Sequence, residues 1–227
     1  MIIEDSTDMK RNIAFICLLL LCLTAQAQVT WNTKGGAGLA VSLTDANVDP
    51  KPKFVAKLGV GIETPLTPDL SLMPSLEIAL KGGKYDSVEF QKEGGSETLN
   101  LTYLQIPVLM AYRLHLGGFN NITLKAGPYF AYALSGKVKA EFANISGGSL
   151  DYEVNIFDMD ELEQVNADAS ITPSKAKRFD VGIDAGIDFE FRRFVAGLEY
   201  EVGFLSMAPN GANMKNQAFY LTVGYKF

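Results

Sequence analysis

The fold is decided by residues 178–191, RFDVGIDAGIDFEF, in which apolar and polar residues alternate without a break. The apolar positions are Phe179, Val181, Ile183, Ala185, Ile187, Phe189 and Phe191. The intervening positions are Asp180, Gly182, Asp184, Gly186, Asp188 and Glu190. Because successive side chains of a β-strand point to opposite faces, this segment predicts a strand with one apolar face and one charged face.

The same alternation recurs along the chain, in segments separated by clusters of Gly, Pro, Asn and Asp. Eight strands are predicted, at 34–43, 54–64, 70–82, 99–116, 122–137, 178–191, 194–206 and 217–227. A tilted strand crosses a membrane with about 9–11 residues, so each segment is long enough to span one.

The N-terminal region has the features of an export signal. Lys10 and Arg11 precede the apolar stretch 13–23, and Ala-Gln-Ala follows at 25–27. A basic region, a short apolar region and a small-x-small site are typical of a secretory signal peptide, with cleavage expected after Ala27.

This signal gives the predicted domain organisation. Residues 1–27 form the signal peptide, with Met9 as an alternative true start because residues 1–8 are acidic, and 28–227 form a single β-barrel domain. Both cysteines, Cys17 and Cys22, belong to the signal. The predicted mature chain therefore has neither a disulfide nor a cysteine-ligated metal.

Alternation alone does not say which face of the strands meets the core, but the connections do. Short predicted turns at 65–69, 117–121 and 192–193 alternate with longer segments at 85–98 and 138–177 and an intermediate one at 207–216. The connection 44–53 is only moderately long and fits the alternation less well. Short turns on one side and long loops on the other are typical of bacterial outer-membrane barrels. The prediction is an all-β, eight-stranded, antiparallel up-and-down transmembrane β-barrel with short periplasmic turns and longer extracellular loops.

The chain closes its last predicted strand with Tyr225 and Phe227. A terminal phenylalanine on an alternating strand looks like the signal read by the barrel assembly machinery of the cell outer membrane. We therefore expect that machinery as a partner, recognising Phe227, and we expect the barrel to be a monomer.

If the apolar face meets lipid, the charged face fills the lumen. The predicted lumenal residues are Lys34, Lys57, Glu63, Glu77, Lys81, Arg113, Lys125, Asp180, Asp184, Asp188, Glu190, Glu199, Glu201 and Lys226. Such charges must pair, because an isolated buried charge is very costly. Eight strands enclose a lumen just wide enough to be filled by side chains, so little or no conductance is expected.

No catalytic, cofactor or metal site is predicted. The single histidine, His115, is expected on the surface near the turn at Gly117, with no nucleophile at a recognisable spacing. One acidic cluster lies in the longest loop, at Asp158, Asp160, Glu161 and Glu163. It lacks the spacing and the glycine of a calcium loop. A second acidic set, Asp180, Asp184 and Asp188, is expected to pair with lysine and arginine.

Four segments carry a resemblance to a known family: YLQIPVL at 103–109, GPYFAY at 127–132, DVGIDAG at 180–186 and VGYKF at 223–227. With them, the predicted mature chain resembles the PorT-like outer-membrane β-barrels of Bacteroidetes, often called the porin family. The resemblance implies an eight-stranded barrel in the outer membrane and supplies no catalytic residues.

The expected function is structural or surface-binding and non-enzymatic. Loop 138–177 would be held at the cell surface, where it contacts lipopolysaccharide, outer-membrane lipids, a protein partner or an external ligand. The net charge of -6 argues against nucleic acid. Three alternatives remain at this point: a subunit of an envelope protein-secretion complex, an outer-membrane enzyme, and a secreted lipocalin-like barrel that holds a small apolar ligand.

Overall fold

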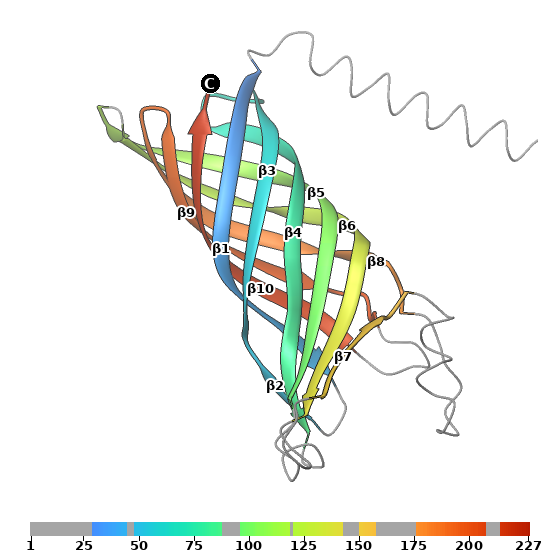
Figure 1. Cartoon of the computed structure of the whole chain (residues 1–227). Helices are drawn as coiled ribbons and strands as arrows, with labels where there is room; N and C mark the ends of the chain where they lie inside the picture. The colour runs from blue at the N-terminus through green and yellow to red at the C-terminus, as the bar shows by residue number, and fades with distance from the viewer. Residues whose placement is uncertain are drawn as a thin grey trace, which may run out of the picture.

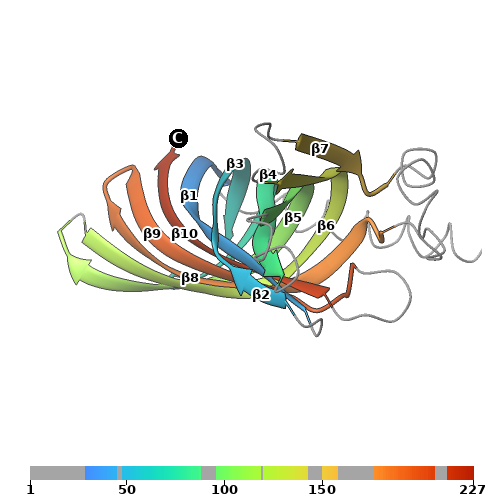
Figure 2. The ribbon, with the colours of Figure 1, turned by 60° about the horizontal axis from the view of Figure 1, so that its bottom comes forward.

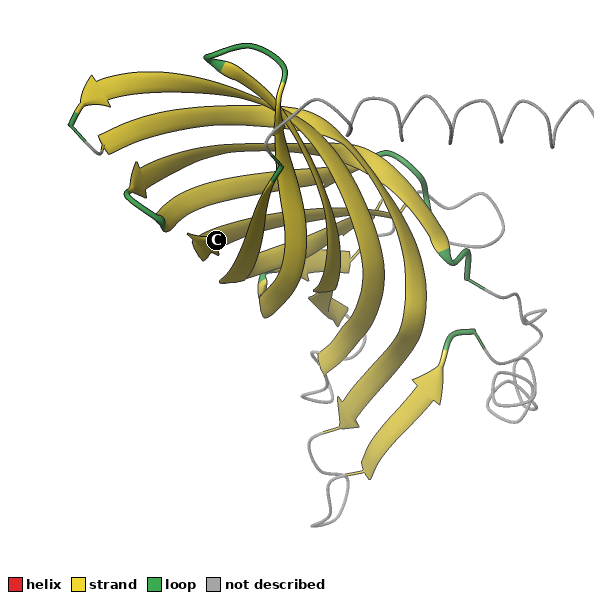
Figure 3. Cartoon of the chain, turned by 90° about the horizontal axis from the view of Figure 1, so that it is seen from above, coloured by secondary structure: helices red, strands yellow, loops and turns green. Residues whose placement is uncertain are grey.

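The computed structural model describes residues 29–44, 48–87, 96–118, 120–142, 150–157, 176–207 and 214–227. The predicted signal peptide and the cluster Asp158, Asp160, Glu161 and Glu163 lie outside these residues. Within them the chain forms strands and turns (Figure 3), and no helix there has the length and apolarity needed to cross a membrane. The strands are β1 Thr30–Thr44, β2 Val48–Lys51, β3 Lys53–Pro65, β4 Leu70–Ser87, β5 Ser96–Gly117, β6 Asn120–Phe142, β7 Leu150–Asn155, β8 Phe179–Phe191, β9 Phe194–Gly203 and β10 Met214–Lys226.

Eight of these strands close into a barrel (Figure 1). From β3 onward, β4, β5, β6, β8, β9 and β10 each pair antiparallel with the next, and β1 closes the circle between β10 and β3. At the closure, Lys34 lies opposite Gly224 on one side and Gly59 on the other. Closure leaves no barrel strand with an unpaired edge, which is the condition for crossing hydrocarbon with β-structure.

The eight predicted strands are confirmed, but the predicted loops are too long. Loop 138–177 contains the end of β6 and the whole of β7, which pairs with Lys137–Phe142 of β6. Figure 2 shows β7 beside β6 at the rim. The segment 44–53 contains β2, which pairs with the end of β4. β2 has four residues and β7 has six, so the alternation in each covers too few residues to predict a strand from the sequence.

The two ends of the barrel differ. At the short-turn end, the predicted short turns join β3 to β4, β5 to β6 and β8 to β9. The barrel strand β1 begins at this end, and β10 ends there. At the loop end, β2 and β7 extend the sheet. This asymmetry places the short-turn end on the periplasmic side and the loop end outside the cell.

The two faces of the strands are reversed relative to a water-soluble protein. On β8, Asp180 and Asp184 are fully buried, whereas Phe179 is 50% exposed. On β3, the outward Leu58 is 69% exposed. Exposed aromatic side chains gather at both ends of the outer face: Trp31, Phe191, Phe194 and Phe227 at the short-turn end, and Phe54, Tyr132, Phe179, Phe204 and Phe219 at the loop end. An apolar band between two aromatic belts is the outer face of a membrane barrel.

The outer band gives a direct prediction. Leu58→Arg on β3 places a charge in the band and should lower the free energy of unfolding by about 2–4 kcal/mol. The matched control is Leu66→Arg, because Leu66 lies in the turn between β3 and β4 and is also exposed. Urea unfolding in phospholipid vesicles measures both. Equal effects of the two substitutions would contradict the placement of the band.

Candidate functional site

The lumen contains all the charged residues predicted for it. Twelve are buried, and Lys34 and Arg113 are partly exposed. They are arranged in layers along the barrel axis. The layers are described from the short-turn end toward the loop end.

The layer nearest the short-turn end is a balanced set of two acids and two bases. Lys226 Nζ donates hydrogen bonds to Glu63 Oε2 and Glu190 Oε1, each at 2.7 Å. Arg113 Nη2 donates to Glu63 Oε1 at 2.5 Å, and its Nε lies 3.3 Å from Glu190 Oε2. Thr123 Oγ1 also donates to Glu190, at 2.7 Å. This layer ties β3, β5, β6, β8 and β10 together.

Lys57 is the centre of the middle layer. Its Nζ lies 2.8 Å from Glu201 Oε1 and 3.6 Å from Glu77 Oε2, and it also contacts Glu199. Lys34 Nζ lies 2.9 Å from both Glu77 and Glu199. These contacts cross the lumen from β1 and β3 to β4 and β9. Buried charges this close are stabilised only as a set, since removal of one leaves its partners uncompensated.

Two further lysines complete the middle layer. Lys125 Nζ lies 2.5 Å from both Asp188 and Glu199. Lys81 Nζ lies 2.7 Å from Glu201 and stands 4.1 Å from the ring centre of Tyr129, a cation–π contact. Lys81 therefore marks the boundary between the charged part of the lumen and an aromatic part beyond it.

The loop end of the lumen is filled by an apolar plug that the sequence did not predict. Its buried residues are Tyr85, Leu99, Leu101, Tyr103, Tyr129, Ala131, Ala133, Phe157 and Met207. Phe157 and Met207 lie just beyond β7 and β9, so connecting segments contribute to the plug. Arg178 contacts the plug at two points. Its guanidinium stands 4.2 Å from the Phe157 ring centre and donates a hydrogen bond to the Ala133 carbonyl. On β5 the buried Leu99, Leu101 and Tyr103 alternate with Asn100 and Thr102, so the apolar face points inward there, the reverse of the polarity that the sequence predicts for the barrel.

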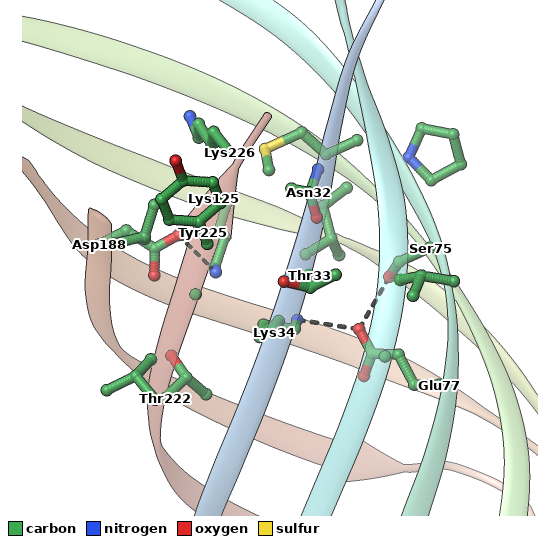
Figure 4. A pocket seen from close by; sticks show the side chains of 18 residues that line it. Asn32, Thr33, Lys34, Ser75, Glu77, Lys125, Asp188, Thr222, Tyr225 and Lys226 are labelled. Atoms are coloured by element: carbon green, nitrogen blue, oxygen red, sulfur yellow. Dashed lines mark hydrogen bonds and ion pairs between the residues drawn. The ribbon is translucent and has the colours of Figure 1, made fainter. Parts of the chain in front are cut away.

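The free space in the middle of the barrel is small. A cavity of about 40 Å³ lies beside Lys34, Glu77, Lys125 and Asp188 (Figure 4). A water molecule needs about 10–15 Å³ of such space, so the cavity has room for a few waters. A wider cavity of about 380 Å³ opens at the short-turn end, where Glu63, Arg113, Glu190 and Lys226 line it. The middle layer and the plug separate this mouth from the loop end, which supports the expectation of little or no conductance.

Three carboxylates of the middle layer come close together. Ligand atoms of Asp184, Glu199 and Glu201 lie within 4.8 Å of one another. The Lys57 ammonium already contacts Glu199 and Glu201, so it supplies the positive charge that a metal ion would supply. Among the described residues, Asp184 makes no hydrogen bond through either side-chain oxygen. This cluster is therefore an ion-pair centre.

The expected pairing of the three β8 aspartates with lysine or arginine is only partly right. Asp188 pairs with Lys125. Asp180 instead accepts a hydrogen bond from the Tyr129 hydroxyl at 3.1 Å. Asp184 lies between Gly127 and Glu201 on the neighbouring strands, and neither supplies a cation. The sequence predicts that each aspartate points into the lumen. It does not predict which lysines on other strands lie close enough to pair with them.

His115 lies where the sequence places it, near the end of β5 at the short-turn end. Its side chain is 57% exposed, and its Nδ1 lies 3.4 Å from Asp69 Oδ1. Asp69 is itself half exposed on the neighbouring turn. The pair therefore sits on the periplasmic rim, far along the strand from the loop end.

The closed barrel, its apolar outer band and its charged lumen define a small outer-membrane β-barrel protein. Residues 24–208 match the family model described as "Outer membrane protein beta-barrel domain", and the chain belongs to that family. It therefore resides in the cell outer membrane, which excludes the secreted water-soluble barrel considered above.

Solved structures with a similar barrel share little sequence with this chain. The attachment invasion locus protein Ail of Yersinia pestis is 13% identical, with a TM-score of 0.44, covering 87% of this chain and 98% of Ail. Neisserial surface protein A is 10% identical, with a TM-score of 0.41, covering 87% and 97%. A major outer membrane protein of Thermus thermophilus is 12% identical, with a TM-score of 0.46, covering 88% and 99%. No curated protein matches the sequence.

The middle layer predicts a large effect of one substitution. Lys57→Met removes the ammonium that Glu199 and Glu201 share and should lower the free energy of unfolding by about 3–5 kcal/mol. The control is Lys139→Met, which breaks an exposed pair with Glu153 and should change little. The heat-dependent shift in gel mobility and urea unfolding in vesicles report on both. A stable Lys57→Met barrel would mean that the cross-lumen pairs do not hold it together.

Proposed function

We propose that this protein is a non-enzymatic, surface-binding barrel that contacts lipopolysaccharide phosphates at the outer face of the membrane and forms no open channel. The observation that carries the proposal is a ring of exposed basic side chains around the loop end. Its members are Lys51, Lys84, Lys137, Lys139 and Lys177. They come from β2, β4, β6 and the segment before β8, so this partial ring follows the barrel mouth from β2 to β8, and β1, β9 and β10 contribute no member to it.

One exposed acid is described within this ring. Among the side chains described at the loop end, Glu153 of β7 is the exposed acid, and it lies between Lys137 at 2.6 Å and Lys139 at 2.9 Å. Hydrogen bonds from these two lysines hold the pKa of Glu153 below its usual value. Among the side chains described at this end, five exposed lysines and one exposed acid therefore lie at the height of the outer headgroups. A lysine ammonium binds phosphate as a point charge, without demanding a fixed geometry.

The remaining parts of the molecule fit a binding role better than a catalytic one. The lumen holds paired charges and an apolar plug, and His115 lies at the opposite, periplasmic end. The strand extensions β2 and β7 enlarge the surface outside the membrane. We therefore assign the function to the rim and not to the interior. Phe227, which ends the chain after β10, is proposed as the residue that the barrel assembly machinery recognises.

Lipopolysaccharide binding tests the proposal. Lys84→Gln/Lys177→Gln should weaken binding of purified lipopolysaccharide by about fivefold for each lysine, because one basic residue near a charged lipid surface contributes about 1 kcal/mol. The effect should shrink as salt is raised. The matched control, Arg192→Gln/Arg193→Gln, removes two charges at the periplasmic end and should bind normally. Unchanged binding by the lysine variant would contradict the proposal.

A separate measurement tests the closed lumen. The protein inserted into planar bilayers should give no conductance steps above those of the detergent alone, because the middle layer and the plug occupy the path. Single-channel steps that persist at neutral pH and are lost on heat unfolding would show an open pore. That result would move the function from the rim to the interior.

The finer placement of the chain, in the PorT-like barrels of Bacteroidetes, is part of the same proposal and is supported by the segments 103–109, 127–132, 180–186 and 223–227. That placement raises a second role, as a subunit of an envelope protein-secretion complex. Cross-linking in intact cells distinguishes the two. A stable complex with other envelope proteins favours the secretion role, and a monomer that retains lipopolysaccharide favours the surface-binding role.

A further inference from the structure

The outer band is interrupted by a hollow on β8, β9 and β10. The hollow has a volume of about 500 Å³ and is lined by apolar side chains, among them Ile187, Phe189, Leu198, Leu221 and Val223. It lies on the lipid-facing side of the barrel, where each of these five side chains is at least 40% exposed.

The hollow exists because a small residue lies between large ones. Ala196 of β9 lies opposite Phe189 on β8 and opposite Val223 on β10. Two residues further along β9, the outward side chain is the larger Leu198, which lies opposite Ile187 on β8 and Leu221 on β10. An alanine in this position leaves a space that bulkier neighbours enclose. A hydrocarbon chain would fill this space and recover the dispersion contacts that it lacks.

A pair of arginines stands at the periplasmic end of the same hairpin. Arg192 and Arg193 form the turn between β8 and β9. From Arg193 to Ala196 the chain covers about 10 Å at 3.3 Å per residue. Phe194 and Tyr225 flank the path in an edge-to-face contact, with ring centres 5.3 Å apart. From the periplasm toward the membrane centre, the surface therefore presents the arginine charges, then the aromatic pair, then the apolar hollow. The headgroup, interfacial region and acyl chain of a phospholipid follow in the same order.

The backbone of this turn points to a role for the Arg192 side chain. Arg192 has a φ of 56°, and it is the one non-glycine residue with positive φ in the described part of the chain. Glycine is preferred at the first central position of such a hairpin turn, and a side chain there is strained. The Arg192 guanidinium stands 5.6 Å from the ring centre of Phe191, which faces lipid. Arg192 and Arg193 also line the periplasmic mouth of the lumen, so the turn stands at the rim between that mouth and the lipid-facing surface.

We propose that this surface binds one acidic phospholipid of the periplasmic leaflet. Arg192 and Arg193 bind the phosphate, and an acyl chain occupies the hollow over Ala196. The occupant is a phospholipid and not a free anion, because the lining of the hollow is mostly apolar, with Asp188 and Thr222 as its polar residues, and the hollow lies in the hydrocarbon region. It is acidic because two adjacent guanidinium groups favour a headgroup with net negative charge. This site is independent of the lysine ring at the other end.

Lipid retention in detergent micelles tests the site by native mass spectrometry. The probes are phosphatidylglycerol and phosphatidylcholine with identical acyl chains. The protein should retain one phosphatidylglycerol in preference to phosphatidylcholine. Arg192→Gln/Arg193→Gln should reduce that preference by about fivefold for each arginine. Lys84→Gln/Lys177→Gln should keep it. Equal retention of the two lipids by the unaltered protein would overturn the proposal, as would an arginine variant that keeps the preference.

The hollow is tested separately. Ala196→Leu fills the space and should lower retention of phosphatidylglycerol, whereas Ala126→Leu, at an exposed alanine of β6 outside the hollow, should not. Added glycerol phosphate should fail to displace the lipid. If Ala196→Leu retains phosphatidylglycerol normally and glycerol phosphate displaces it, the turn binds a free anion and the lipid site is wrong.

Arg192→Gly separates binding from folding. Glycine relieves the positive φ, so the urea midpoint should stay the same or rise, while the preference for phosphatidylglycerol falls. The variant must also keep its heat-dependent mobility shift, which shows that the barrel is folded. A lower lipid preference then cannot result from misfolding. A lowered midpoint together with an unchanged lipid preference would show that Arg192 is structural, and would overturn its role in binding.

Discussion

The contact between Lys57 and the carboxylates of Glu199 and Glu201 is the interaction on which the rest of this barrel depends. It joins β3 to β9 across the lumen, where the solvent is largely replaced by protein. A membrane barrel presents its apolar residues to lipid, so its interior has to be held together by polar contacts. In a lumen of eight strands there is little room for water, and each charge needs a partner within reach. The lysines that converge on Glu199 supply those partners.

The ion pairs and the plug together explain why function is assigned to the two rims. The short-turn layer around Glu63 and Glu190 closes the periplasmic side, and the aromatic plug around Tyr103 closes the outer side. Between them lies a cavity of about 40 Å³. Among the described residues, the accessible parts include the lysine ring outside the cell, the lipid-facing band, and the arginine turn facing the periplasm. The ring and the turn each offer positive charge at the height of a phosphate-bearing headgroup.

The sequence predicts the barrel well because strand periodicity and barrel polarity act on the same residues. From Phe179 to Phe191 every residue lies on the expected face, and the predicted lumenal charges are all directed inward. Prediction fails in two places. The strands β2 and β7 are too short for their alternation to predict a strand. Near Leu101 and Tyr103, β5 turns its apolar face inward, the reverse of the rest of the barrel. The surroundings of Asp180 and Asp184 could not be predicted from the sequence either, because they depend on contacts between strands and not on the position of each residue within its own strand.

Spin-label accessibility along β8 tests the central claim most directly, since residues 29–227 contain no cysteine and single labels can be introduced without a background. Labels at positions 183–188 would be compared for collision with oxygen, which concentrates in hydrocarbon, in protein inserted into phospholipid vesicles. The account predicts an accessibility with a period of two, with maxima at positions 183, 185 and 187 and minima at 184, 186 and 188. Maxima at positions 184, 186 and 188, or no period of two, would contradict an apolar face turned to lipid and a charged face turned to the lumen.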